Sequence, residues 1–290
     1  MKALLLTVAL LLGCVTVSSQ DKDTGIITVS TNDLSMVFSI SPDKKVVYNY
    51  FGDKFQDVSP FLHKKYKEQP DNGIGYAPVI YPAYGGRFFL NPALKLTHDD
   101  GVQTTELIYA AHQVKNIDNN RIETVIQLKD PLYPVFVNLN FTAYQKENVI
   151  CQSVSISHQE KNKLAVENIA SAYLPLHADS YYLTHFHGAW ASEMQLVEEQ
   201  LTPGVKRVES KKGIRTTQSE NSSFLLSLNG PANEDMGEVY AGSLAWSGNY
   251  LSSFEIDECG LLHVMSGMND FASTYNLEPG KALQTPEMVW

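Results

Sequence analysis

Hydrophobic and polar residues alternate along most of this chain, which is the pattern of β-strands with one buried face. The clearest example is residues 136–144, where polar residues alternate with Val137, Leu139 and Phe141. Turn-forming clusters separate such runs, and Asp118-Asn119-Asn120 is one of them. The pattern therefore predicts strands joined by short turns.

The pattern predicts about fifteen strands and no amphipathic helix. In chain order the predicted strands span Ile26–Val29, Leu34–Ile40, Val46–Phe51, Thr104–Gln113, Ile122–Lys129, Phe136–Tyr144, Val149–His158, Val166–Leu174, Tyr181–Gly188, Met194–Leu201, Val205–Lys211, Phe224–Leu228, Val239–Trp246, Leu251–Ile256, Leu261–Ser266 and Thr274–Leu277. Ser247-Gly248-Asn249 and Glu258-Cys259-Gly260 are predicted hairpin turns. So many strands in one open sheet would curl or split, so we expect an all-β fold, a large antiparallel two-sheet sandwich in one domain.

Between Pro60 and Gly86 the alternation stops. Prolines and glycines punctuate this stretch, and aromatic residues are interleaved with them, namely Tyr66, Tyr76, Tyr81 and Tyr84. A long segment without strands is usually either functional or disordered, and the aromatic content argues against disorder. We therefore interpret it as a long ordered loop.

Residues 1–19 have the pattern of an export signal, with the basic residue Lys2, the apolar run Ala3–Leu12 and small residues up to Ser19. A lipoprotein signal that makes Cys14 the lipidated first residue is the alternative. Cleavage near Ser19 is favoured because Leu12 is large for its position in the lipid-attachment sequence Leu11-Leu12-Gly13-Cys14. We expect a protein exported to the periplasm or the extracellular space, without a transmembrane span.

The formal net charge is −10, and removing residues 1–19, whose only charge is Lys2, leaves −10 − 1 = −11. An acidic chain is a poor partner for nucleic acid or an anionic membrane, whereas a neutral sugar remains compatible. Cys151 and Cys259 are the cysteines that follow the signal. One disulfide could form after export, but two cysteines do not make a disulfide framework, so we expect separate, semi-buried thiols.

The stretch Tyr181–Met194 gathers four aromatic residues and two histidines into fourteen positions. Its alternation breaks at Gly188, so Trp190 is expected at a strand end or in the loop that follows. Flat aromatic rings suit sugars, whose C–H faces stack on them while their hydroxyl groups bond to nearby polar residues. The alternative interpretation is that Trp190 is a core residue that plugs the end of the sandwich.

Other candidate chemistry is weak. His185 and His187 lie two positions apart, with His158 and His177 as further candidates, but the acidic companion of a metal site is missing, so we expect no metal and no cofactor. Glycoside hydrolysis needs two carboxylates that face each other across a pocket. Adjacent acidic pairs are expected on the surface instead, namely Asp99-Asp100, Glu198-Glu199, Glu234-Asp235 and Asp257-Glu258.

Several segments together resemble the N-terminal domain of glycoside hydrolase family 36 α-galactosidases. They are Tyr81-Pro82 with Gly85, Pro92-Ala93-Leu94, Gly188-Ala189-Trp190 with Glu193, Lys211–Thr217, Gly237–Tyr240 with Ser247–Asn249, Leu277–Gly280 and Gln284–Glu287. Each segment is a weak signal alone, but the set keeps its order from about Gly25 to the final residue.

The resemblance implies a β-supersandwich that precedes a catalytic (β/α)8 barrel, in retaining enzymes that act on terminal α-galactosides such as melibiose and raffinose. Both catalytic aspartates of the family lie in that barrel, so no catalytic residue is expected here, and the barrel is expected after Trp290. The last residues, Leu283–Trp290, are apolar, which also favours the front part of a longer protein. The family's Gly-x-Trp segment corresponds to Trp190, which is therefore the expected substrate-binding residue.

This chain departs from the family at one loop. Many members carry Gly-Asp-Phe-Arg where Arg87-Phe88-Phe89-Leu90 stands here, so the acidic residue and the arginine are missing. In tetrameric members this loop reaches a neighbouring subunit's active site, so a homo-oligomer is a further expectation whose contacts must differ.

We therefore expect the N-terminal part of an exported α-galactosidase, inactive alone, whose Pro60–Gly86 loop serves assembly or lines the rim of the sugar pocket. Its expected partners are an α-galactoside and its own barrel domain. One alternative is a stand-alone β-sandwich that binds glycans without cleaving them. The other is a β-enzyme with a histidine-bound metal.

Overall fold

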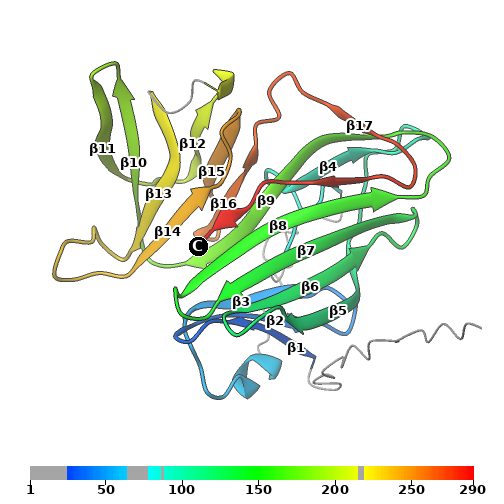
Figure 1. The fold of residues 1–290 in the computed structure, drawn as a ribbon, viewed down its shortest axis with the longest axis horizontal. Coiled ribbons are helices and arrows are strands. Elements are labelled where there is room, and N and C mark those ends of the chain that lie inside the picture. The colour runs from blue at the N-terminus through cyan, green and yellow to red at the C-terminus, as the bar shows by residue number, and fades with distance from the viewer. Residues whose placement is uncertain (1–24, 64–77, 86–87, 215–218) are drawn as a thin grey trace, which may run out of the picture.

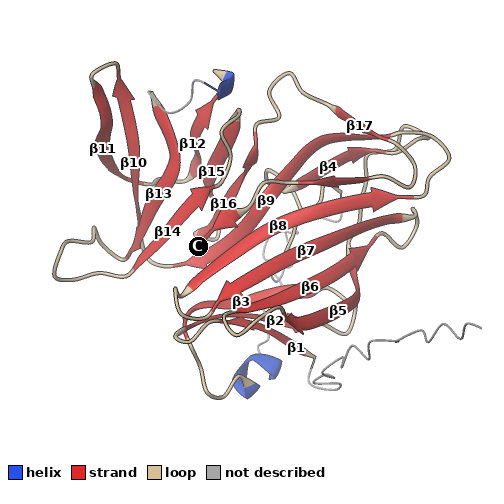
Figure 2. Ribbon diagram, viewed as in Figure 1, coloured by secondary structure: helices blue, strands red, loops and turns tan. Residues whose placement is uncertain are grey.

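The computed structural model describes residues 25–63, 78–85, 88–214 and 219–290, and the named elements among them are nineteen strands and the short 3-10 helix η1 (Figures 1 and 2). The 3-10 helix η1 spans Ser59–His63. The strands are β1 (Ile26–Ser30), β2 (Leu34–Ile40), β3 (Val46–Asp53), β4 (Leu94–Thr97), β5 (Ile108–Asn116), β6 (Arg121–Lys129), β7 (Val135–Tyr144), β8 (Val149–His158), β9 (Leu164–His177), β10 (Tyr181–Ala189), β11 (Ser192–Gln200), β12 (Gly204–Ser210), β13 (Glu220–Leu228), β14 (Val239–Leu244), β15 (Tyr250–Ile256), β16 (Leu261–Met268), β17 (Tyr275–Leu277), β18 (Ala282–Gln284) and β19 (Met288–Val289).

All strand pairs between these elements are antiparallel, and they form three sheets. The large sheet has ten strands in the order β11-β10-β13-β14-β19-β8-β7-β6-β5, with β18 also paired to β8. The smaller sheet has six, in the order β12-β15-β16-β9-β17 with β4 beside β9, and β1-β2-β3 form a third. The predicted all-β sandwich is confirmed, and the opening meander forms a sheet of its own. Figure 1 shows the large sheet running from β11 at the upper left to β5 at the lower right.

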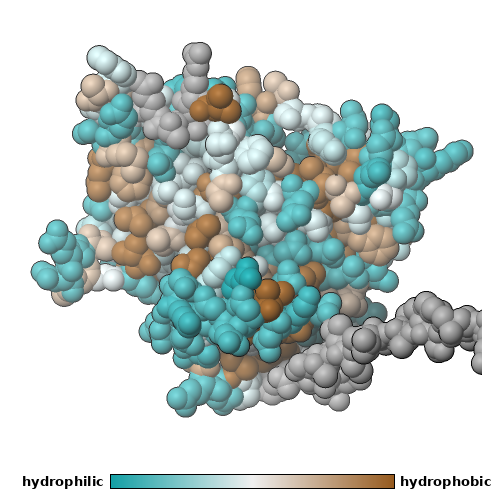
Figure 3. Space-filling model, in the orientation of Figure 1, coloured by the Kyte–Doolittle hydropathy of each residue, from teal (hydrophilic) through white to brown (hydrophobic). Residues whose placement is uncertain are grey.

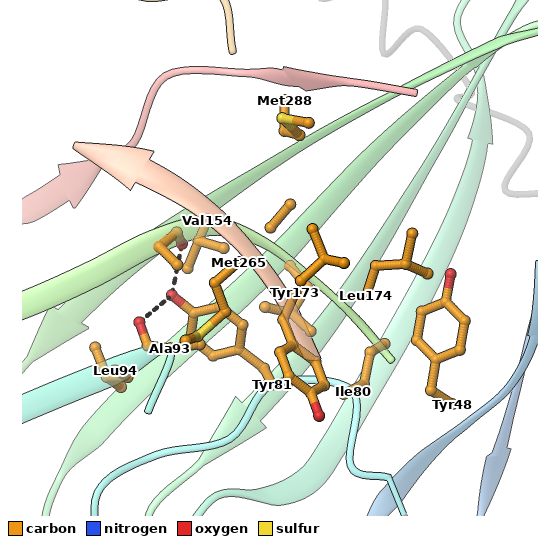
Figure 4. Packing of buried hydrophobic residues seen from close by; sticks show 14 of the residues in the cluster. Tyr48, Ile80, Tyr81, Ala93, Leu94, Val154, Tyr173, Leu174, Met265 and Met288 are labelled. Carbon is orange, nitrogen blue, oxygen red and sulfur yellow. Dashed lines mark hydrogen bonds between the residues drawn. The ribbon is translucent and has the colours of Figure 1, made fainter. Parts of the chain in front are cut away.

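The core lies between the sheets. On β7 the inward residues Val137, Leu139 and Phe141 are fully buried, as the alternation predicts. Tyr81 fills the space over β9, and its hydroxyl group contacts the carbonyl oxygens of Ala170 at 2.6 Å and Ala93 at 3.2 Å (Figure 4). A buried hydroxyl needs such partners, so the loop that carries Tyr81 is fixed against the smaller sheet.

β19 joins two halves of the large sheet, because Met288 and Val289 pair with β14 on one side and with β8 on the other. The backbone of Trp290 exchanges hydrogen bonds with Ile150, at 2.9 and 3.1 Å. Its indole ring is buried and lies edge-on to Phe224, with ring centroids 6.2 Å apart. The segment expected to be an apolar strand is therefore part of the sheet.

Some predicted elements were wrong or missed. Ser247-Gly248-Asn249 is not a hairpin turn, because β14 lies in the large sheet and β15 in the smaller one. A turn sequence shows that the chain reverses, but not whether the next strand pairs with the last. The turn at Glu258-Cys259-Gly260 does join two paired strands, β15 and β16. The short strands β4 and β18, of four and three residues, were missed because they are too short for a period of two to show.

Part of the Pro60–Gly86 loop lies outside the described residues, as do residues 1–19, Arg87 and the last three residues of the Lys211–Thr217 motif. The described portion is ordered as expected: Val79 forms a bridge to Val47, and Ile80 and Tyr81 are buried. No helix among the described residues has the length and apolar character needed to cross a membrane.

Both described cysteines are free thiols. Cys151 is buried, and burial together with the charge of Glu287 raises its pKa to about 11. Cys259 is exposed in the β15–β16 turn. The expectation of separate thiols is confirmed, although only Cys151 is buried.

Candidate functional site

Trp190 lies at the tip of the hairpin formed by β10 and β11, at one edge of the large sheet. Ala189 and Ser192 form the last pair of the hairpin, so Trp190 and Ala191 make up its loop, where Ala191 has a φ of 58°. The expectation of a position at the strand end or in the following loop is confirmed. Figure 1 shows this tip at the free upper-left end of the molecule.

The side chain of Trp190 is 83% exposed. The interpretation as a core residue is therefore wrong. The alternation of hydrophobic and polar residues could not predict the exposure of Trp190. It does not show whether the tip of a hairpin ends against the facing sheet or extends beyond it. The face of the indole ring is therefore open to contact from outside this domain.

The base of the hairpin is held rigidly by Tyr181, the first residue of β10. The buried Tyr181 hydroxyl group accepts a hydrogen bond from the backbone N–H of Ala178 at 2.9 Å and faces the carbonyl oxygens of Leu176 at 2.9 Å and Gly260 at 2.8 Å. Gly260 belongs to the β15–β16 turn, so the hairpin is tied to the smaller sheet.

A charged network ties the middle of the hairpin to the same sheet. Glu199 of β11 pairs with Lys206 of β12 at 2.5 Å and with Nε2 of His185 at 3.1 Å. Burial lowers the pKa of His185, and Glu199 only partly offsets this. Desolvation raises the pKa of Glu199, but Lys206 and His185 outweigh it, so that pKa lies below its usual value. Because an ionised carboxylate only accepts hydrogen bonds, a neutral His185 carries its proton on Nε2 and donates it.

Near the tip, polar groups from two further segments gather beside His187 of β10. Lys212 contacts Glu220 at 3.1 Å and the hydroxyl group of Ser219 at 2.7 Å, and Nδ1 of His187 lies 3.9 Å from Glu220. The backbone N–H of Gly188 donates to the carbonyl oxygen of Ser219 at 2.8 Å, which joins β10 to the segment before β13. The hairpin end thus offers an exposed aromatic face with ammonium, imidazole, hydroxyl and carboxylate groups on neighbouring segments, which is the chemistry that sugars bind.

Below the hairpin, a buried hydrogen-bond chain crosses the smaller sheet. The Tyr173 hydroxyl group donates to Nδ1 of His263 at 2.7 Å, and Nε2 of His263 donates to Asp257 at 2.9 Å. The other Asp257 oxygen accepts the backbone N–H groups of Cys259 and Leu261, at 2.8 and 2.9 Å. Desolvation raises the pKa of Asp257, but these hydrogen bonds outweigh it and hold the pKa below its usual value.

The segment that departs from the family pattern lies beside this chain. The ring of Phe88 stands edge-on to His263, with centroids 5.9 Å apart, and Asn91 donates to Glu255 at 2.6 Å. The next residue, Phe89, is 68% exposed.

The four histidines considered as metal ligands are not brought together. His158 is buried, with Nε2 donating to the carbonyl oxygen of Leu277, whereas His185 and His187 lie on the hairpin. Among the described residues, no group of three or more His, Cys, Asp or Glu side chains could hold a metal ion. Of the adjacent acidic pairs expected on the surface, Asp257 is instead buried, because it accepts hydrogen bonds from the backbone of the β15–β16 turn, whereas Glu199 forms an ion pair with Lys206.

Sequence reasoning found Trp190 but missed the polar residues that contact its hairpin or lie near its tip, namely Lys206, Lys212, Ser219 and Glu220. It also missed the buried pair of Tyr173 and His263 in the smaller sheet. These residues come from separate segments, and no spacing along the chain links them. The Gly188-Ala189-Trp190 segment was the only local signal.

The comparisons with known proteins agree with one another. A model described as the glycosyl hydrolase family 36 N-terminal domain matches residues 44–278. The α-galactosidase AgaA of Geobacillus stearothermophilus is 30% identical over 279 residues, covering 88% of this chain and 38% of that protein. Mel36A of Lactobacillus acidophilus, also an α-galactosidase, is 26% identical over 226 residues, covering 73% and 31%.

Solved structures give the same result. AgaA superposes with a TM-score of 0.80 at 28% identity, over 91% of this chain and 40% of that one. An AgaA variant in complex with raffinose gives a TM-score of 0.83, with the same identity and coverage. A further variant was solved with stachyose. The chain thus spans at most about two fifths of the length of these relatives.

Proposed function

The chain belongs to glycosyl hydrolase family 36 as its N-terminal domain, and on that basis we propose that it is the first part of an exported, retaining α-galactosidase that acts on terminal α-galactosides. The relatives named above are α-galactosidases, and AgaA variants bind raffinose and stachyose. The two carboxylates that retaining hydrolysis requires are assigned to a barrel domain that follows this one in the same polypeptide.

The observation that carries the sugar-binding role is the exposed indole of Trp190 on a braced hairpin. Its flat face is free to stack on the C–H groups of a pyranose ring. Tyr181 and the Lys206–Glu199–His185 network hold the hairpin in place, so little conformational entropy is lost when the sugar binds. In this proposal Trp190 orients the substrate and keeps water from one side of it, while the barrel performs the bond cleavage.

The test is Trp190→Ala in the whole enzyme. Loss of a central aromatic anchor costs about 2 kcal/mol, so we expect kcat/KM for raffinose to fall about thirtyfold. Trp190→Phe should retain most of the activity because it keeps a flat ring. Phe271→Ala is the control, since Phe271 is also an exposed aromatic residue, at 60%, but lies in the loop after β16.

Thermal stability should stay within about 1 °C in the alanine variant, because the removed side chain is mostly exposed. An unchanged kcat/KM for Trp190→Ala would show that the indole does not touch the substrate.

A stand-alone glycan-binding sandwich would display an exposed tryptophan in the same way. Reading the gene beyond the codon for Trp290 separates the two functions. A continuing frame of alternating strands and helices supports the enzyme, and hydrolysis of melibiose by the gene product confirms it. Binding of galactosides without any hydrolysis would favour the glycan-binding protein.

Export is proposed from residues 1–19. N-terminal sequencing of the secreted protein should begin just after Ser19. A lipidated Cys14 as first residue would overturn this and place the protein on a membrane surface.

A further inference from the structure

A polar groove lies where the loop after β16 comes close to β4 and β9. Its volume is about 430 Å³, within the range of small-molecule sites, and its polar lining consists of Lys95, Glu167, Asn168, Asp270, Ser273 and Thr274. Figure 1 shows β4 and β17 at the right of the molecule, away from the β10–β11 hairpin at the left, and Figure 3 shows mostly hydrophilic atoms over that side. The polar groove is therefore separate from the site at Trp190.

A β-bulge directs two successive residues of β9 into the polar groove. Lys95 of β4 pairs with Asn168. The next residue, Leu96, pairs with Val166, which leaves Glu167 without a partner on β4. Successive side chains of a regular strand point to opposite faces, whereas a bulge re-aims one of them. Glu167 and Asn168 therefore both line the groove, which an unbroken strand could not arrange.

Glu167 is held firmly in this position. It accepts hydrogen bonds from Thr97 and, at 3.2 Å, from Gln103, and it pairs with Lys95 at 2.6 Å. These contacts, the one with Lys95 foremost, keep the pKa of Glu167 below its usual value, so it is a carboxylate at neutral pH. Lys95 also lies over the ring of Tyr84, with Nζ 5.7 Å from the ring centroid, and Tyr84 is 43% exposed. An aromatic ring thus borders the polar groove.

The loop that forms the other wall of the groove is fixed by Asn269. The side-chain amide of Asn269 donates to Glu209 at 3.0 Å and to the carbonyl oxygen of Tyr250 at 3.1 Å. Its side-chain oxygen accepts the backbone N–H of Phe271 at 2.9 Å. The ring of Phe271 lies against Lys211, whose Nζ is 4.6 Å from the ring centroid, and does not line the groove. The loop therefore has a defined shape before any ligand binds, which lowers the entropy lost on binding.

The polar groove contains hydrogen-bonding groups that the protein leaves unused. Among the described residues, none hydrogen-bonds to the side-chain oxygens of Asp270, Ser273 or Thr274. The ammonium group of Lys95 repels a cation, whereas the carboxylates of Glu167 and Asp270 repel an anion. A hydroxyl group both donates and accepts, so it suits carboxylate, hydroxyl and ammonium groups alike. The groove therefore fits a neutral ligand rich in hydroxyl groups.

We propose that the polar groove is a second carbohydrate site, which holds a neutral hexose chain of a polymeric substrate, an inference that rests on the proposed function. The exposed ring of Tyr84 gives the C–H face of a sugar a surface to lie against. No bond is cleaved there, because Glu167 is ionised and paired with Lys95 and cannot supply the acid that glycoside hydrolysis needs. Holding a polymer here raises the effective concentration of its galactosyl branches at the catalytic site.

The first test is affinity electrophoresis of the full-length enzyme in native gels with and without galactomannan, a polymer of neutral hexoses with α-galactosyl branches. A second pair of gels contains saturating 1-deoxygalactonojirimycin, a compound bound in an AgaA variant, to keep the catalytic site occupied. We expect galactomannan to retard the enzyme in both pairs of gels, because the polar groove stays open. Loss of the retardation when the compound is added would overturn the proposal, and so would an enzyme that galactomannan never retards.

The second test changes the groove in the full-length enzyme. Ser273→Trp fills the groove from an exposed position, and Asp270→Ala removes an unused carboxylate. We expect the Kd for galactomannan to rise at least fivefold in both variants, while kcat/KM for raffinose stays within twofold of the wild type. Asn119→Trp, in the exposed β5–β6 turn, is the bulk-matched control and should bind galactomannan as the wild type does.

Two outcomes of the second test would contradict the proposal. A wild-type Kd for galactomannan in Ser273→Trp would show that the groove does not hold the polymer. An equal loss in kcat/KM for raffinose would show that the groove belongs to the catalytic site.

Failure of this inference can be told apart from failure of the proposed function. A protein that hydrolyses raffinose, but whose retardation is the same in Ser273→Trp, keeps the proposed function and loses the second site. A protein without hydrolytic activity whose retardation is lost in Ser273→Trp has the carbohydrate site and lacks the proposed activity.

Discussion

Replacing Asp257 by asparagine keeps the shape of the side chain and removes its charge. The asparagine oxygen can still accept the backbone N–H groups of Cys259 and Leu261. Its amide group, however, would point N–H donors at Nε2 of His263, which itself donates in the wild type. The change therefore sets two donors against each other inside the smaller sheet.

Reversing the His263 tautomer would relieve that clash but transfer it to Tyr173. Nδ1 would then carry the proton and face the Tyr173 hydroxyl group, whose own hydrogen would lose its acceptor. Tyr173 is 1% exposed, so water cannot replace the lost partner. Losing a charge-assisted bond or leaving one buried donor unpaired costs about 2–3 kcal/mol. For a chain of this size the melting temperature should fall by about 4–10 °C.

The effect should also depend on pH. The folded state lowers the pKa of Asp257, so its stabilisation is fully present above the unfolded value, near 3.9, and is lost as pH falls through the folded value. Urea unfolding of wild type and Asp257→Asn should therefore differ by a constant free energy from about pH 8 to 5, and the curves should converge below about pH 4.

Tyr173→Phe is the control, because it removes the hydroxyl group at one end of the hydrogen-bond chain while Asp257 keeps its charge. If Asp257→Asn cost less than about 0.5 kcal/mol at pH 7, the assigned proton positions would be wrong. A difference between the two proteins that persisted unchanged to pH 3 would show that the carboxylate charge is not what stabilises the turn.

Two further substitutions test the packing of β14 against the core and the titration of His185 in β10. Gly242→Ala places a Cβ 2.6 Å from Cε of Met288 and also against the buried ring of Phe224; we expect a loss of about 1–3 kcal/mol in urea unfolding, and an unchanged midpoint would show that the core has room. The folded protein lowers the pKa of His185, so the unfolded chain binds more protons as pH falls and the free energy of unfolding decreases between about pH 7 and 5. His185→Gln should make this decrease smaller. Equal slopes of unfolding free energy against pH for both proteins would refute this.

Much of the fold follows from local pattern. The alternation in residues 135–144 identifies β7 and its buried face because each side chain on a strand between sheets must choose core or solvent. The same logic located most other strands. It could not assign strands to sheets, since β14 and β15 follow each other in the chain yet lie in different layers.

For the candidate site too, local pattern predicts some features, while others depend on contacts between distant segments. Trp190 was found because glycine and the end of an alternating run mark a hairpin loop. Its exposure depends on how far the hairpin extends, and its support depends on Lys206 from another sheet. The hydrogen-bond chain from Tyr173 through His263 to Asp257 could not be predicted from the sequence either, because contacts between β9, β16 and the β15–β16 turn leave no periodic signal. Pattern thus identifies elements, while the site arises from contacts distant in sequence.

The joint at β19 has a consequence for how the protein reaches its native state. The indole N–H of Trp290 contacts the side chain of Gln152, which lies 138 residues earlier in the chain. Contacts of such separation form late, after each half of the large sheet has paired its own strands. Until then the edges of β14 and β8 are open templates for pairing with other molecules. Residues 288–290 therefore govern refolding yield at high protein concentration, and their deletion should produce aggregation before any measurable loss of secondary structure.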